Sequence, residues 1–461
     1  MYAEQASRLN GISTTMGKTP ALLLPMTRRR KIQLLLWAYF WLLIFEGALR
    51  KWVAPDLSNV LLVARDPVCI GAIWFGMPYL LSGAVRRWIL GLAAIGGLGF
   101  LLAILVGHRD VVTAAYGARI LVLHFPMIFL FGTVFTRDDA WKFARAVLIL
   151  AIPMTVLIAF QYSLPSTHFV NIAPGGEGTA GFSGAMGKMR PPGTFSFITG
   201  LSSFYGLAAA FFAGWLTCGP RPVPRWIWLS AAGMVFALPL SISRTLFFHY
   251  ALVAIFATTA SALAGRAIIS FLSGVVLLTV LAAGISQFEL FQEAREVFLA
   301  RWENAQRSDA PDEGGISRIL VNRVGGSFAQ AIAMVDDVNL FGAGIGLATN
   351  VGAVRSIGQK GFVIAEGAWP AMVGELGPIL GFSLIAWRVM LALKMIFIAF
   401  RQSLIKNTLP LILGGIALQG LVIGQISQPT GLGFLVISAG LMLAACNLEM
   451  RRVLVASHQD V

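Results

Sequence analysis

Two arginines stand where long apolar segments of this chain end, and they are the first candidates for chemistry. Arg190 lies in Met-Arg-Pro-Pro-Gly-Thr-Phe and Arg244 in Ser-Ile-Ser-Arg-Thr-Leu. Ionisable groups near membrane depth are costly, so they usually mark a site. A guanidinium offers parallel N–H donors to phosphate oxygens, and two such cations on one face indicate a bound anion. For Arg244, the alternative is a side chain that reaches from a helix end towards water.

The residues around both arginines favour an anion site. Pro and Gly at 191–193 precede a helix that we expect to begin at Thr194, whose free amides and positive dipole end would face a phosphate. Lys188 is a further candidate contact with substrate. The alternative is a capped loop whose basic groups touch lipid headgroups. Near Arg244, three hydroxyl side chains are placed to orient the guanidinium: Ser241, Ser243 and Thr245.

A carboxylate and an aromatic ring lie where the chain re-enters an apolar segment, in Ala-Glu-Gly-Ala-Trp-Pro-Ala-Met-Val-Gly-Glu-Leu-Gly. Glu366 is the candidate base, because a carboxylate beside apolar surface can accept a proton from a sugar hydroxyl. Trp369 and Glu375 are candidate substrate contacts, since an indole face can stack on a pyranose ring. An interfacial aromatic anchor with a hydrogen-bonded carboxylate is an equal alternative.

Further candidates lie in the polar segment that precedes this point. Arg318 and Arg323 are candidate contacts for phosphate or glycan. Gly-Ala-Gly-Ile-Gly at 342–346 has neither a strand before it nor a complete dinucleotide fingerprint, so we interpret it as a tight backbone passage. Asp336 and Asp337 lack further oxygen ligands, which favours a solvated helix end over a divalent-cation site.

Several enzyme classes lack their characteristic residues in this chain. The 5 histidines include no His-Glu-x-x-His pair, and no Gly-x-Ser-x-Gly elbow occurs. The 3 cysteines are far apart in sequence and form no Cys-x-x-Cys pair. We therefore expect neither a metal nor another cofactor.

The segments that position these residues are strongly apolar. The 461 residues are 57% hydrophobic and 12% charged, with a mean hydropathy of +0.77, which a soluble domain of this length would not tolerate on its surface. Apolar runs of about 20 residues suit spanning helices, whose backbone groups are bonded internally. We predict an all-α, polytopic transmembrane helical bundle of about twelve spans. These lie near 32–50, 60–83, 88–107, 118–136, 141–162, 193–217, 225–242, 244–265, 267–286, 369–396, 407–426 and 429–447.

The net charge of +14 is spread over short clusters between apolar runs, which indicates membrane topology and not nucleic-acid binding. With a cytoplasmic N-terminus, these clusters follow the positive-inside rule. The basic residues 28–31 precede a first span that we expect to be retained. The predicted organisation is a cytoplasmic tail (1–31), spans 1–9 (32–286), an extracytoplasmic loop (287–368), spans 10–12 (369–447) and a cytoplasmic tail (448–461).

The extracytoplasmic loop between spans 9 and 10 is too long to be structureless, so we expect short helices in it. Residues 287–304 combine apolar residues at helical spacing with glutamates, which predicts an amphipathic helix near the bilayer surface. Charges also gather at the outer end of the first span and the start of the second. They are either structural ion pairs or the border of a lipid entry: Glu46, Arg50, Lys51, Arg65 and Asp66.

The order of these motifs resembles the family of bacterial O-antigen polymerases and O-antigen ligases. The similarity covers about residues 185–395 and lies in the order of short motifs. The matching pieces are Arg-Pro-Pro-Gly-Thr-Phe (190–195), Ser-Ile-Ser-Arg-Thr (241–245), Ser-Arg (317–318) in the large loop, Asn-Leu-Phe-Gly-Ala-Gly-Ile-Gly (339–346) and Gly-Glu-Leu-Gly (374–377).

The resemblance implies a membrane-embedded, metal-independent glycosyltransferase whose donor is a glycan on undecaprenyl pyrophosphate. Arg190 and Arg244 match the family arginines that are taken to bind the pyrophosphate. Family ligases commonly carry a histidine just before the re-entering span, where this chain has Glu366 and Trp369. This departure weakens the ligase assignment and leaves the base open.

We therefore expect a polysaccharide polymerase of the bacterial plasma (inner) membrane, acting at its outer face in O-antigen or exopolysaccharide synthesis. The expected partners are the lipid-linked donor, a glycan acceptor, membrane lipids and other polysaccharide-assembly membrane proteins, but no nucleic acid. One alternative is a ligase that passes finished glycan to a lipid or protein. Another is a lipid-linked-sugar flippase or transporter, which predicts a charged cavity at the bilayer midplane, whereas the charges here gather at the outer margin.

Overall fold

The computed structural model describes residues 26–176, 184–265, 284, 286–309, 316–358 and 363–447, and the side chains of 304–309 and 316–324 lie outside this description. Within these residues the chain is all-helical, as the sequence predicts, and no strand occurs. The principal helices are α2 (Met26–Ala48), α4 (Arg65–Leu80), α5 (Gly83–Leu105), α6 (Val111–Arg119), α7 (Pro126–Val134), α8 (Arg137–Ser163), α9 (Ile198–Cys218), α10 (Arg225–Leu240), α11 (Arg244–Leu263), α13 (Glu289–Asp309), α14 (Ile316–Asp337), α15 (Asn350–Ile357), α16 (Ala368–Leu404), α17 (Leu409–Ile423) and α18 (Pro429–Cys446). Shorter helical pieces are η2 (Leu49–Val53), η3 (Pro55–Leu57), α3 (Ser58–Leu61), η4 (Ile120–His124) and η5 (Phe169–Asn171).

In the described part of the chain, 9 helical segments are long and apolar enough to cross a membrane. They are Met26–Val53, Pro55–Leu80, Gly83–Leu105, Val111–Val134, Arg137–Ser163, Ile198–Cys218, Arg244–Leu263, Ala368–Leu404 and Pro429–Cys446. The shorter apolar helices α10 and α17 coincide with two further predicted spans. The predicted span 267–286 lies almost wholly outside the described residues. These helices are consistent with a multi-pass membrane protein.

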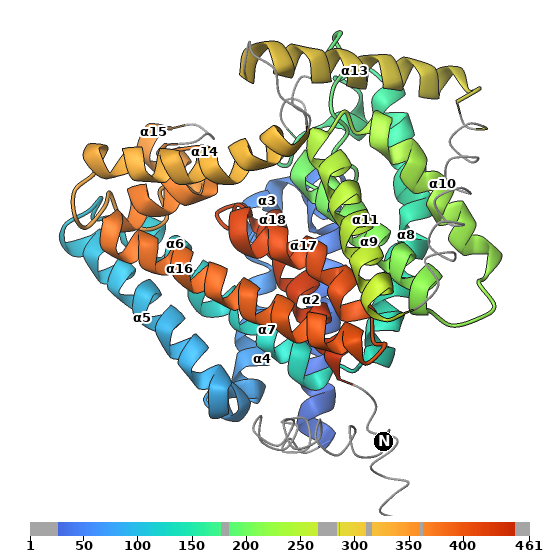
Figure 1. The fold of residues 1–461 in the computed structure, drawn as a ribbon. Helices are drawn as coiled ribbons and strands as arrows, with labels where there is room; N and C mark the ends of the chain where they lie inside the picture. The colour runs from blue at the N-terminus through green and yellow to red at the C-terminus, as the bar shows by residue number, and fades with distance from the viewer. Residues whose placement is uncertain are drawn as a thin grey trace, which may run out of the picture.

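The bundle has two ends that can be told apart by their contacts. At one end, the start of α2 meets the end of α7, where Arg29 Nε donates to the Val134 carbonyl at 2.9 Å. The other end, here called the α13 face, comprises η2, residues 184–197, the α10–α11 turn and α13. Figure 1 shows α13, in gold, lying across the bundle above α10 and α11. Lys188, Arg190 and Arg244 lie at this second end.

The segment that follows Arg190 is held in an irregular conformation by a buried lysine. Lys51 Nζ donates to the carbonyls of Gly193 at 2.7 Å and Phe195 at 2.9 Å, and its side chain is fully buried. Gly193 has a φ of 63°, a left-handed conformation that glycine adopts readily. The prediction of a helix from Thr194 is therefore wrong, because α9 begins only at Ile198. A phosphate cradle made of helix amides does not form next to Arg190.

The other charges near η2 form ion pairs inside the protein. Glu46 binds Arg65 at 3.0 Å and Arg50 at 3.4 Å. Asp66 binds Arg119 at 2.5 Å. Glu46, Arg50 and Arg65 are all buried. Of the two alternatives in the sequence analysis, structural ion pairs are therefore favoured over the border of a lipid entry.

The glycine-rich segment at 342–346 packs against a break in α16. Gly377 has φ 74° and ψ 170°, which interrupts the helix just before Pro378. The amides of Ala343 and Gly344 donate to the carbonyls of Gly374 at 2.8 Å and Glu375 at 2.9 Å. Non-helical backbone in a membrane protein needs such internal partners. The interpretation of this segment as a tight backbone passage is confirmed.

Candidate functional site

Arg190 and Arg244 lie on the α13 face, close enough for the charge of one to act on the other. Burial is the main reason why the pKa of Arg190 falls to about 10, and the positive charges of Arg301 and Arg244 lower this pKa further. The negative charge of Glu366 raises it. Arg190 remains protonated at neutral pH. Three guanidinium groups and one carboxylate therefore share a single region, although they come from four separate parts of the chain.

A tight turn at 184–188 places Arg190 against the α10–α11 connection. The Gly184 amide donates to the Lys188 carbonyl at 2.8 Å, which closes the turn. A Cβ at Gly184 would lie 2.9 Å from the Ile242 side chain and 3.5 Å from that of Arg190. A glycine permits this close approach because it has no Cβ, and the turn therefore packs against Ile242, two residues before Arg244.

The α10–α11 turn is itself rigid. Ile242 is fully buried and has a φ of 46°, which is unusual for a β-branched residue. Ser243 caps α11 by accepting from the Leu246 amide at 3.4 Å, and its hydroxyl pairs with that of Ser202 at 2.8 Å. These contacts fix the backbone from which Arg244, the first residue of α11, projects.

Arg301, on α13, is a member of the site that the sequence analysis missed. Its Nη1 donates to the Gly184 carbonyl at 3.4 Å, and burial together with the charge of Arg244 lowers its pKa. The signal for it was present in the sequence. Ala294 and Val297 are buried, and Arg301 continues their helical spacing, so a cation occupies the buried stripe of an amphipathic helix. Such a position is costly for an arginine without a function.

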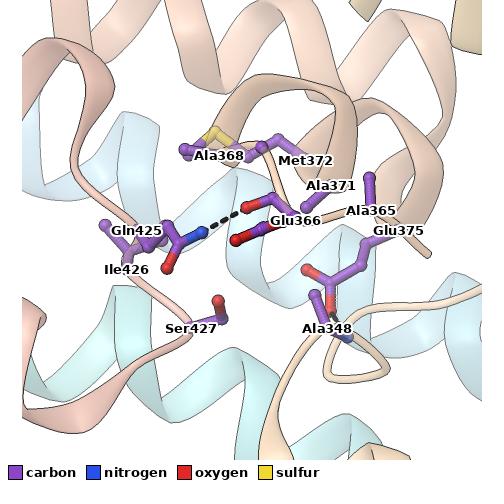
Figure 2. Close-up of a pocket in the computed structure, with 11 residues that line it drawn as sticks. Ala348, Ala365, Glu366, Ala368, Ala371, Met372, Glu375, Gln425, Ile426 and Ser427 are labelled. Carbon is purple, nitrogen blue, oxygen red and sulfur yellow. Dashed lines mark hydrogen bonds between the residues drawn. The ribbon is translucent and has the colours of Figure 1, made fainter. Parts of the chain in front are cut away.

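Glu366 borders a small pocket between α16 and the segment that follows α17 (Figure 2). The polar groups around this pocket come from Glu366, Glu375, Gln425 and Ser427. Gln425 donates from its side chain to the Glu366 carbonyl, which holds the two walls together. Glu366 is exposed at its position just before α16. The remaining lining residues are Ala348, Ala365, Gly367, Ala368, Ala371, Met372 and Ile426.

Arg388 supports the wall of this pocket from within the bundle. Its side chain is fully buried, and its Nη2 donates to the carbonyls of Gly420 at 2.9 Å and Gly424 at 2.7 Å. These carbonyls belong to the C-terminal end of α17, where a cation complements the helix dipole. Arg388 therefore fixes the backbone that leads into Gln425 and Ser427.

Two candidate substrate contacts of the sequence analysis are engaged with the protein itself. Glu375 accepts the amides of Gly346 at 2.8 Å and Ala348 at 2.7 Å, although its carboxylate also lines the pocket (Figure 2). Trp369 donates to the Val422 carbonyl at 2.6 Å and is only 6% exposed. This burial leaves little ring surface for a sugar. The structure favours the anchoring alternative for Trp369 and a hydrogen-bonded, positioning carboxylate for Glu375.

Lys188 binds Glu293 of α13 at 2.6 Å, and its ammonium also lies 4.8 Å from the centre of the Tyr162 ring. It therefore joins the 184–188 turn to α13.

Arg318 and Arg323 are in α14, but their side chains lie outside the described residues. Across the described part of the chain, no group of three or more His, Cys, Asp or Glu is arranged to hold a metal ion.

No known family model matches this chain, and no curated protein matches it significantly in sequence. Function is therefore inferred from the residues, their geometry and the motif resemblance.

Proposed function

We propose that this protein is a polysaccharide polymerase, a membrane-embedded glycosyltransferase that moves a glycan from undecaprenyl pyrophosphate to a sugar hydroxyl. One observation carries the proposal: on one face of an apolar helical bundle, Arg190 lies within reach of the charges of both Arg244 and the Glu366 carboxylate. The order of motifs that resembles O-antigen polymerases and ligases supports the same assignment. The product would enter O-antigen or exopolysaccharide synthesis.

The chemistry is a displacement at the anomeric carbon of the donor glycan. The acceptor hydroxyl oxygen forms a bond to this carbon while the bond from the carbon to the phosphate oxygen breaks. The electron pair of that bond stays on the leaving undecaprenyl pyrophosphate. The hydroxyl proton passes to the Glu366 carboxylate, which acts as the base.

The arginines stabilise the leaving group. Charge develops on the phosphate oxygen as the glycosidic bond breaks, and fixed donors aimed at this charge lower the barrier without rearrangement. Arg190 and Arg244 project from rigid backbone segments, and Arg190, with a pKa of about 10, is protonated at neutral pH. A guanidinium pair of this kind can perform the neutralising role that a divalent metal plays elsewhere.

We propose that the attacking hydroxyl group of the acceptor enters the small pocket beside Glu366. Gln425 and Ser427 offer side-chain hydrogen-bonding groups there, as sugar hydroxyls require. Glu366 links this pocket to the arginine site, because it lines the pocket and its charge acts on Arg190.

The proposed topology places the α13 face outside a bacterial plasma membrane. About twelve spans follow from the apolar runs, and the distribution of basic residues places both termini in the cytoplasm. Residues 287–368 form the extracytoplasmic loop, of which α13, α14 and α15 are described helices. The proposed partners are the lipid-linked donor, the growing glycan, membrane lipids and other polysaccharide-assembly proteins.

The test compares lipid-linked oligosaccharides in cells that contain the wild-type protein, Arg244→Ala or no protein. Loss of a polymerase leaves single repeat units on the carrier. Normal-length polymer stranded on the carrier would instead identify a ligase, and units trapped on the inner face a flippase. Arg295→Ala, an exposed change on α13, is the matched control and should leave the profile unchanged. Membrane insertion of each variant is measured in parallel.

A further inference from the structure

We propose that Arg301 is a third phosphate-binding residue and that α13 is the element which delivers it, so that the site selects a lipid diphosphate over a lipid monophosphate. This inference rests on the proposed function, because it concerns the same donor. It adds a residue from the large loop, Arg301, to the pair Arg190 and Arg244.

Two sets of contacts join the part of α13 around Arg301 to the segments that carry Arg190 and Arg244. Its Nη1 donates at 3.4 Å to the carbonyl of Gly184, the residue whose backbone lies against the Arg190 side chain. The neighbouring Trp302 ring lies 5.3 Å from that of Phe247 and 6.0 Å from that of Phe248, both in the first turn of α11. That turn begins with Arg244. One turn of α13 therefore touches both of the backbone segments that carry the other two arginines.

Further contacts of α13 with the 184–188 turn and with α10 hold Arg301 in place. Lys188 and Glu293 form an ion pair of 2.6 Å between the 184–188 turn and α13. The Phe236 ring of α10 lies 6.0 Å from Phe288 and 5.7 Å from Phe291, at the start of α13. Figure 1 shows α13 crossing above α10 and α11, so its buried stripe faces the ends of these helices. Arg301 lies on that stripe.

The charges of the site match those of the reaction. A lipid diphosphate joined to a sugar carries two negative charges, and Glu366 adds a third, against three guanidinium cations. After transfer, the leaving diphosphate carries a third negative charge, while Glu366 has taken up the hydroxyl proton and become neutral. The sum is the same before and after the reaction. A third arginine therefore stabilises the charge that develops on the leaving group.

The same arrangement explains a preference for two phosphates. Guanidinium groups commonly bind phosphate oxygens in pairs, so two arginines suffice for one phosphate. A third guanidinium from another element can reach the second phosphate. A lipid monophosphate lacks the second phosphate and therefore forgoes this charge-assisted contact.

The experiment measures binding of undecaprenyl pyrophosphate and undecaprenyl phosphate to the full-length protein in nanodiscs of neutral phospholipid. The wild-type protein should bind the diphosphate more tightly. Arg301→Ala and Arg301→Gln should weaken diphosphate binding about tenfold or more, with little change for the monophosphate, since a charge-assisted hydrogen bond is lost. Arg301→Lys should retain part of the preference. Arg295→Ala is the matched control on the exposed side of α13 and should change neither affinity.

The outcomes separate this inference from the proposed function. If the wild-type protein prefers the diphosphate and Arg301→Ala keeps that preference, the role of Arg301 is wrong while the proposed function stands. An equal loss for both lipids would show that Arg301 only holds α13 in place, and would also overturn the inference. If the wild-type protein binds neither lipid, the proposed function fails together with it.

Discussion

The ammonium group of Lys51 donates a hydrogen bond of 2.7 Å to the carbonyl of Gly193, and this bond joins the end of the first helix to the segment that carries Arg190. Lys51 also binds the Phe195 carbonyl at 2.9 Å. These bonds occupy carbonyls that a helix beginning at Thr194 would use, and Gln161 Nε2 also donates to the Gly193 carbonyl at 3.2 Å.

Replacing Lys51 by Met should loosen this segment. The side-chain length is kept, but two carbonyls lose a buried hydrogen-bond donor, so the free energy of unfolding should fall by about 1–3 kcal/mol. Thermal unfolding in detergent measures this loss, and glycan elongation should fall with it. Lys31→Met, at an exposed position near the start of α2, is the control. Equal stability of the two variants would contradict a supporting role for Lys51.

Replacing Glu366 by Gln should slow transfer while the donor still binds. An amide cannot accept the hydroxyl proton, and general-base contributions are typically about 10²–10⁴-fold in rate. The measurement is the initial rate of elongation with purified protein and lipid-linked repeat units. Glu289→Gln, an exposed change at the start of α13, should have the wild-type rate. A Glu366→Gln rate close to wild type would exclude this carboxylate as the base.

The protonation of Arg190 should respond to its charged neighbours. Burial and the charges of Arg301 and Arg244 lower the pKa of Arg190 to about 10, so its charge is present at neutral pH and is lost as pH rises through about 10. Arg244→Ala should raise the pKa of Arg190, and Glu366→Gln should lower it. The pH dependence of phenylglyoxal modification, followed by mass spectrometry of the Arg190 peptide, measures the shift.

The direction of the shift is the decisive feature of that experiment. Neutral guanidine is the reactive form, so the pH of half-maximal modification should increase in Arg244→Ala and decrease in Glu366→Gln. The exposed variant Arg295→Ala should leave it unchanged. A pH profile of Arg190 that is identical in all these proteins would contradict electrostatic contact in the site.

The glycine at 346 should be far less replaceable than the glycine at 358. Gly346 has a φ of 104°, and a Cβ there would overlap the Thr113 carbonyl, whereas a Cβ at Gly358 (φ 74°) meets nothing within 4 Å. Gly346→Ala adds a clash to the conformational cost and should lower stability by about 2–5 kcal/mol. Gly358→Ala should cost only about 1–2 kcal/mol. Equal melting temperatures would contradict the tight packing of the 342–346 passage.

Part of this architecture was predictable from the sequence, because apolar runs of membrane length become helices wherever the backbone has no other partners. The all-helical fold and the apolar segments follow from that rule. The start of α9 could not be predicted in this way. Lys51 donates hydrogen bonds to carbonyls at the start of the predicted helix, and a contact so distant in sequence leaves no local pattern. The break of α16 at Gly377 likewise depends on the amides of a remote loop.

The candidate site was predictable to a similar degree. Arg190 and Arg244 stood out as cations at the ends of apolar segments, and the structure places them in electrostatic contact. Arg301 was hidden among the charges of an amphipathic helix, where only its helical spacing from buried residues distinguishes it. Trp369 appeared available to a sugar, but its burial against α17 depends on tertiary packing.

In the proposed function, Arg190 and Arg244 bind the same diphosphate. The most direct test is a cryo-electron microscopy structure of the protein in nanodiscs with undecaprenyl pyrophosphate bound. We predict that both guanidinium groups lie within about 3 Å of oxygens of one diphosphate. A diphosphate held at another place on the protein, or by only one of the two arginines, would contradict the account.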